Sequence, residues 1–110
     1  MIDMLKNANT ESALRTFAST IKGVTEGVAC KGTALESTTF NRGKNSFLFL
    51  KVENGRYSIR LKLEASREEA SKHYKVGAKG WATLQFTEES APPIETLKRW
   101  ITESHKLAAK

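Results

Sequence analysis

Residues 46–63 contain the dipeptide Asn54-Gly55 between two runs of alternating side chains, which predicts a β-hairpin. Asn-Gly supplies the two positive-φ positions of a type I′ turn, and a two-residue turn fixes how the two strands pair. With that register one face of the hairpin is uniformly apolar, and we expect it to belong to the core. Its cross-strand pairs are Val52 with Tyr57, Leu50 with Ile59, and Leu48 with Leu61.

The opposite face of the same hairpin mixes aromatic rings with cations. The register pairs Lys51 with Ser58, Phe49 with Arg60, and Phe47 with Lys62 on that face. Rings and cations side by side on an exposed sheet face are typical of a binding surface.

The positive charge of the chain is concentrated in and just before this hairpin. Residues 42–62 hold six cations and one anion, a net charge of +5, while the whole chain carries +6. After residue 63 the charges nearly balance, with eight cations and seven anions. A basic excess confined to one hairpin indicates an anionic partner, whereas a solubilising surface is the alternative explanation.

The length and composition predict one domain, residues 1–110, in a cytoplasmic protein. No apolar run approaches the roughly 18 residues of a membrane helix, and the first residues lack the apolar stretch of a signal peptide. The single cysteine, Cys30, excludes an internal disulfide and any cysteine-rich metal site. We therefore expect no membrane association, no metal and no cofactor.

The periodicity along the chain predicts an α+β fold, an antiparallel sheet of about four strands with helices on one face, in the order α-β-β-β-α-β-α. Helices on one face would leave the ring-and-cation face of the hairpin uncovered. The first predicted element is a helix capped by Asn9 or Thr10 and ending near Lys22, followed by a strand over 28–35 and a connecting loop over 37–45. After the hairpin we expect a short helix that begins with a capping box of Ser66 and Glu69 and ends before Gly77. A strand over 81–86 and a helix from Pro93 complete the chain.

Catalysis has little support in the sequence, and we expect no enzyme activity. Cys30, His73 and His105 are residue types that nucleophilic catalysis uses, but they lie on elements far apart in the chain and no nucleophile motif surrounds Cys30. The two histidines are not at metal-ligand spacing, so no metal site is predicted.

Nucleic-acid binding is the function that the rings and cations favour, in a non-enzymatic small binding protein. Rings can stack on unpaired bases and cations can neutralise phosphates. A protein-interaction or dimerisation surface on the same face, and a small-molecule pocket between the sheet and residues 37–45, are the alternatives, and the oligomeric state stays open between a monomer and a weak dimer. The residues expected to stack are Phe47, Phe49 and Trp81, and those expected to meet phosphates are Lys31, Lys51, Arg60 and Lys62.

Several segments together resemble the MmcQ/YjbR family of small bacterial proteins, over about residues 14–108. The resemblance implies an α+β sheet fold similar to bacterial frataxin (CyaY), and members of the family are often labelled DNA-binding on structural analogy. None of the matching motifs is catalytic. They are Gly23-Val24-Thr25-Glu26, Arg60-Leu61-Lys62-Leu63, Lys79-Gly80-Trp81-Ala82-Thr83-Leu84, Pro93, Leu97, Trp100-Ile101, and Ser104-His105-Lys106-Leu107.

The chain departs from that family pattern on both sides of its tryptophan. In the family a histidine usually precedes the tryptophan and an asparagine follows it, whereas Gly80 and Ala82 stand there in this chain. Iron binding of the frataxin type would need an acidic first helix. Here the predicted first helix holds one anion, Glu11, and two cations, Arg15 and Lys22, which argues against iron binding.

Overall fold

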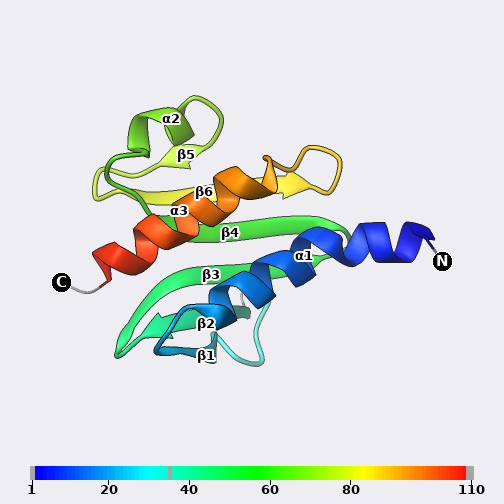
Figure 1. Cartoon of the computed structure of the whole chain (residues 1–110), viewed down its shortest axis with the longest axis horizontal. Helices are drawn as coiled ribbons and strands as arrows, with labels where there is room; N and C mark the ends of the chain where they lie inside the picture. The colour runs from blue at the N-terminus through cyan, green and yellow to red at the C-terminus, as the bar shows by residue number, and fades with distance from the viewer. Residues whose placement is uncertain (1, 35, 109–110) are drawn as a thin grey trace.

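An antiparallel sheet covered on one face by helices is built from residues 2–34 and 36–108, the parts of the chain that this computed structural model describes (Figure 1). Side chains are described from Thr10 onward. The elements found in these residues are α1 (Ile2–Thr20), β1 (Val24–Ala29), β2 (Ser37–Arg42), β3 (Asn45–Glu53), β4 (Arg56–Lys62), α2 (Arg67–Ser71), β5 (Lys75–Val76), β6 (Trp81–Thr87) and α3 (Ile94–Leu107).

The sheet of the described residues has six strands, so the prediction of about four strands was wrong. Its spatial order is β1-β2-β3-β4-β6-β5, and every neighbouring pair is antiparallel. The mixed α+β class agrees with the sequence, but the observed order is α-β-β-β-β-α-β-β-α. Two hairpins account for the difference, β1–β2 and β5–β6.

The β1–β2 hairpin replaces a predicted strand over 28–35 and a predicted loop over 37–45. The chain turns at Cys30 and Gly32, whose φ angles of 54° and 82° are incompatible with a continuing strand. β2 contains Thr38, Thr39 and Phe40, which favour the pleated conformation. A two-residue turn at Gly43-Lys44 then leads into β3, and glycine at the first turn position is typical of a type II′ hairpin.

The register predicted for the β3–β4 hairpin is confirmed from Glu53 and Arg56 to Leu48 and Leu61. Asn54 and Gly55 adopt φ angles of 52° and 77°, as a type I′ turn requires. The predicted Phe47–Lys62 pair is the exception, because the described strands separate beyond Leu48 and Leu61.

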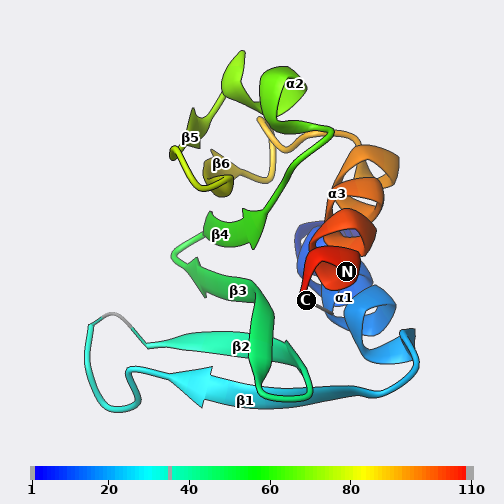
Figure 2. The ribbon, with the colours of Figure 1, turned by 90° about the vertical axis from the view of Figure 1, so that its left-hand side faces the viewer.

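Helices α1 and α3 lie side by side on one face of the sheet and leave the other face uncovered (Figure 2). The hairpin side chains predicted to be core, Leu48, Leu50, Ile59 and Leu61, are at most 1% exposed beneath them. On α3 the buried residues are Leu97, Trp100, Ile101 and Ser104. We call the uncovered face, opposite α1 and α3, the outer face.

Helix α1 begins earlier than predicted, at Ile2. Asn9 and Thr10 are therefore not its cap, and the Thr10 hydroxyl donates a hydrogen bond to the Glu88 carboxylate instead. The helix ends at Thr20, and Gly23, with a φ of 82°, turns the chain into β1.

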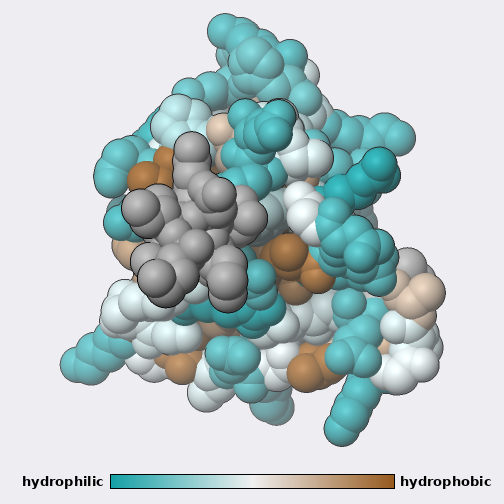
Figure 3. All heavy atoms as spheres, turned by 90° about the vertical axis from the view of Figure 1, so that its right-hand side faces the viewer, coloured by the Kyte–Doolittle hydropathy of each residue, from teal (hydrophilic) through white to brown (hydrophobic). Residues whose placement is uncertain are grey.

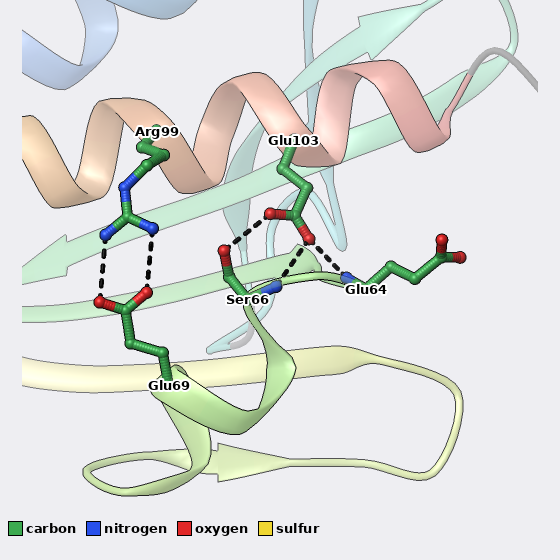
Figure 4. A network of polar contacts seen from close by, with 5 residues as sticks. All are labelled: Glu64, Ser66, Glu69, Arg99 and Glu103. Atoms are coloured by element: carbon green, nitrogen blue, oxygen red, sulfur yellow. Dashed lines mark hydrogen bonds and ion pairs between the residues drawn. The ribbon is translucent and has the colours of Figure 1, made fainter.

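The capping box predicted for the short helix α2 does not form. The Ser66 hydroxyl donates to Glu103 of α3 at 2.8 Å, and the Glu69 carboxylate binds the Arg99 guanidinium through two hydrogen bonds of 2.9 and 3.1 Å (Figure 4). The Glu103 carboxylate also accepts from the Glu64 N–H at 2.6 Å. Helix α3 therefore holds the start of α2 against the sheet.

Candidate functional site

Arg60 lies at the centre of the outer face, on β4 between β3 and β6. The sheet register places Phe49 beside it on β3 and Thr83 on β6, and pairs Lys62 with Trp81 one step further along. The strand that carries Trp81 therefore adjoins the β3–β4 hairpin, so Trp81 lies on the same face as Phe49 and Arg60.

Two adjoining aromatic rings lie beside the Arg60 guanidinium. Its central carbon lies 5.6 Å from the centroid of the Phe49 ring and 5.5 Å from that of the Trp81 ring. The two rings meet edge to face, with centroids 6.0 Å apart and an interplanar angle of 65°. Both rings are half-buried while Arg60 is exposed. We call these three residues the Phe49–Arg60–Trp81 cluster. In it, an exposed cation lies beside two half-buried rings.

Within the part of the chain that the structure describes, no ion pair joins a cation of the outer face to a carboxylate. Register and strand alternation give this face five cations and one carboxylate, Glu53 at the hairpin turn. The ion pairs of the described residues are Arg15–Glu11 and Arg99–Glu69, and neither lies on this face. The outer face therefore carries a positive potential that attracts anions. The five cations are Lys51, Arg56, Arg60, Lys62 and Lys75.

The prediction that Phe47 stacks on a ligand was wrong, because its side chain is only 1% exposed. Phe40 of β2 pairs with Leu48 whereas Asn41 pairs with Ser46, so Phe47 is the extra residue of a bulge in β3. Its ring packs edge-on against the His105 ring of α3, with centroids 5.1 Å apart.

A serine of α3 takes the place of the missing Phe47–Lys62 pair. The Ser104 hydroxyl accepts a hydrogen bond from the Lys62 N–H at 2.9 Å and donates one to the Phe47 carbonyl at 2.6 Å. The two strand ends are thus held apart with their backbone groups satisfied.

A groove with a volume of about 370 Å³ lies where these strand ends separate. This volume falls within the range of small-ligand sites. Rings, cations and the last turn of α3 contribute to its wall, including Phe49, Trp81, Lys44, Lys62 and Leu107. It is continuous with the cluster, since Phe49 and Trp81 belong to both.

Two predicted phosphate-binding residues lie apart from this cluster. The Lys51 ammonium donates a hydrogen bond to the Ala34 carbonyl, so it holds the β1–β2 connection. Lys31 lies in that exposed connection, which projects on the uncovered side of the sheet (Figure 2). By register this connection adjoins the Asn54-Gly55 end of the sheet, whereas Lys62 and Trp81 lie at the other end. Of the predicted site residues, the structure brings together Phe49, Arg60, Lys62 and Trp81.

Two further cations, Lys44 and Lys75, lie near the cluster and were not predicted as site residues. Lys44 belongs to the Gly43-Lys44 turn, and a glycine followed by a polar residue between two β-favouring runs was the available signal. Lys75 pairs with Thr83, which pairs in turn with Arg60, so it extends the row of cations across β5. Its strand is only two residues long and carries no periodic signal.

His105, whose ring packs against Phe47, is partly buried. Burial and the nearby Arg42 guanidinium lower the pKa of His105 below its ordinary value of 6.5, so the ring stays neutral near pH 7. Its Nε2 atom is buried with no hydrogen-bond partner among the described residues. Arg42 also donates to the His105 carbonyl at 3.1 Å, which ties β2 to the end of α3.

The residue types considered for catalysis do not meet. Cys30 is exposed in the β1–β2 connection, His73 follows α2, and His105 lies in the last turn of α3. Among the described residues no cluster of three or more His, Cys, Asp or Glu side chains is placed to share a metal ion. Within the same residues, none of the helices combines the length and apolarity needed to cross a membrane.

Hydrophilic side chains dominate the side of the molecule near the start of α1 (Figure 3). Hydrophobic atoms of the described residues show there only as small separate patches.

Comparison with known proteins identifies no relative: no family model matches this chain, and no curated protein matches it. The resemblance to the MmcQ/YjbR family stays a prediction. The residues of the outer face are therefore the basis for a functional proposal.

Proposed function

We propose that this protein is a non-enzymatic binding protein for single-stranded nucleic acid, and that the outer face of its sheet is the binding surface. The observation that carries the proposal is the position of Arg60 beside the adjoining rings of Phe49 and Trp81, on a face whose cations have no carboxylate partner in the described residues.

The rings favour a single strand over a duplex. A half-buried ring on an open sheet can stack on an unpaired base, whereas bases in a duplex are already stacked on one another. Such stacking contributes about 1–3 kcal/mol per base and tolerates any base, because every base has a π-face. In this proposal Phe49 and Trp81 supply the stacking surface.

The lysines around the rings are placed to meet the phosphates. Lys62 pairs with Trp81 across the strands, Lys44 stands on the wall of the groove, and Lys75 continues the Arg60 row on β5. The ammonium groups of these three lysines donate no hydrogen bond within the described residues. They are therefore free to contact an incoming anion.

Fluorescence anisotropy with labelled single-stranded and duplex oligonucleotides at two salt concentrations tests the proposal. We expect binding to the single strand that weakens steeply as salt increases, because counterions are released from the phosphates. Trp81→Ala should weaken binding by about tenfold through loss of stacking, and Lys62→Ala should weaken it and reduce the salt dependence.

Lys106→Ala is the matched control for Lys62→Ala. Lys106 is an exposed cation on α3, so its removal changes the net charge equally without touching the outer face. Absence of binding at low salt would refute the proposal. Equal weakening by the two lysine variants would also refute the assignment to the outer face.

The groove favours a second candidate function, the binding of a small anionic molecule. Its volume, the rings of Phe49 and Trp81, and the cations Lys44 and Lys62 suit a compact aromatic anion. Titration with mononucleotides, followed by tryptophan fluorescence, to which Trp81 and Trp100 both contribute, distinguishes the two candidates. A small ligand that binds as tightly as an oligonucleotide favours the second one.

A further inference from the structure

We propose that Arg60 makes the protein prefer strands that contain guanine, by donating two hydrogen bonds to the O6 and N7 atoms of one guanine base. This inference rests on the proposed binding of single strands and assigns a base preference to the same site.

Arg60 differs from the other arginines of the chain in having aromatic neighbours and no acceptor. Within the described residues its guanidinium makes no hydrogen bond, yet two rings fix its position. Among the described residues Arg56 has no acceptor either, and it has no aromatic ring beside its guanidinium. The remaining four are engaged: Arg15 with Glu11, Arg42 with the His105 carbonyl, Arg67 with the Ala78 carbonyl, and Arg99 with Glu69.

The guanidinium stands beside the ring centres rather than directly on them. Its distances of 5.6 and 5.5 Å to the two centroids exceed the roughly 3.5–4.0 Å of carbon atoms in direct contact. The guanidinium is therefore not in close stacking contact with either ring, and in this proposal a base stacks on the exposed part of one ring. A base stacked on either ring would turn one edge toward the guanidinium.

The base that suits this arrangement is guanine. An arginine fork donates two parallel hydrogen bonds, and the O6 and N7 atoms of guanine are two acceptors at matching spacing. Adenine offers one acceptor and a competing amino donor at that edge, cytosine offers a donor, and thymine offers a single acceptor. The lysines of the outer face already supply contacts for the phosphates, so the arginine donors are available to the base.

Oligothymidine strands with one central replacement test this proposal by anisotropy. The replacements are guanine, hypoxanthine, 7-deazaguanine and adenine. Guanine and hypoxanthine both carry O6 and N7, whereas 7-deazaguanine stacks like guanine without the N7 acceptor. We expect the first two to bind about five- to tenfold more tightly than the others.

Arg60→Lys keeps the charge and removes the fork, so it should abolish the difference between guanine and 7-deazaguanine while oligothymidine still binds. Arg56→Lys is the control and should retain the difference. Equal binding of all four strands by the wild type would overturn the base preference but not the proposed function. Absence of binding to any strand would overturn both.

Two further outcomes also contradict the inference. If Arg60→Lys weakens every strand by the same factor, Arg60 contacts a phosphate rather than a base. If the guanine preference persists in Arg60→Lys, another group reads the base. Arg60 is exposed, so the variant should fold normally, and thermal unfolding of the variant checks this.

Discussion

The Ser104 hydroxyl donates a 2.6 Å hydrogen bond to the Phe47 carbonyl, joining α3 to a strand that lies 57 residues earlier in the chain. The same oxygen accepts from the Lys62 N–H at 2.9 Å. A single side chain thereby replaces a rung of the β3–β4 ladder, and the groove beside Trp81 opens where the strands part.

Ser104→Ala should destabilise the fold by about 1–3 kcal/mol, because it leaves the Lys62 N–H and the Phe47 carbonyl unpaired in a buried place. Urea unfolding measures this loss, and hydrogen exchange of the Lys62 amide should accelerate. Thr102→Ala is the control: its hydroxyl bonds only the Lys98 carbonyl one turn earlier, so we expect a change within about 0.5 kcal/mol. Equal losses in the two variants would contradict the role of Ser104.

Glu103→Gln should destabilise the protein by about 1 kcal/mol at neutral pH. Burial alone would raise the pKa of the Glu103 carboxyl, but hydrogen bonds from the Glu64 N–H and from Ser66 outweigh it and hold the pKa below 4.5. A lowered pKa means that the carboxylate contributes stability above pH 4.5, and that this contribution is lost as the pH falls through the folded-state pKa.

The difference between wild type and Glu103→Gln should therefore shrink when urea unfolding is repeated at acid pH. Glu89→Gln removes a charge from the exposed β6–α3 connection and serves as the control. A constant difference at all pH values would show that packing, rather than the charge of Glu103, accounts for the loss.

His105 should make the protein less stable in mild acid. Burial and the Arg42 charge lower the pKa of His105 below 6.5, so the unfolded chain binds a proton more readily than the folded one. Stability from the neutral ring is complete above pH 6.5 and declines as the pH falls from there toward the folded-state pKa. His105→Gln should flatten this part of the profile of unfolding free energy against pH. His73→Gln, which alters the exposed histidine after α2, is the matched variant for comparison.

Tyr57→Phe should cost about 1–2 kcal/mol, since the Tyr57 hydroxyl donates to Glu88 at 2.8 Å and accepts from the Glu11 N–H at 3.1 Å. Burial, with the Glu88 hydrogen bond and charge, raises the pKa of Tyr57 to about 12. The stability of the neutral phenol should therefore fall as the pH rises from 10 to 12.

Thermal unfolding at neutral pH and alkaline titration measure the two effects of Tyr57. Tyr74→Phe is the control, because the Tyr74 hydroxyl makes no hydrogen bond within the described residues. A Tyr74 variant as unstable as the Tyr57 variant would refute the importance of the Glu88 contact.

Local chemistry explains which parts of the fold could be predicted. The Asn54-Gly55 turn determined the β3–β4 register by itself, and that register placed Phe49 beside Arg60. The burial of Phe47 accompanies the bulge in β3 and the contact of its ring with His105, which lies on α3 far along the chain, so no pattern around residue 47 could reveal it. Strand alternation alone predicts Phe47 on the outer face, and the bulge in β3 makes that prediction wrong.

Contacts between distant parts of the chain and an unusual backbone angle explain why two local predictions of secondary structure were wrong. The capping box at Ser66 has the correct residues, but Glu103 and Arg99 of α3 compete for both side chains and prevail. The turn at Cys30 requires a positive φ at a residue that rarely adopts it, so nothing in the sequence announced the end of β1 there.

The backbone at Gly80 limits which residue can precede Trp81 in this chain. Its φ is 93°, and a Cβ atom built there would lie 2.4 Å from the Leu63 carbonyl oxygen, a backbone atom that cannot easily move. A histidine before the tryptophan, as in the MmcQ/YjbR pattern, would require a different backbone path into β6. The backbone of this chain at position 80 therefore accommodates glycine and not the histidine of that pattern.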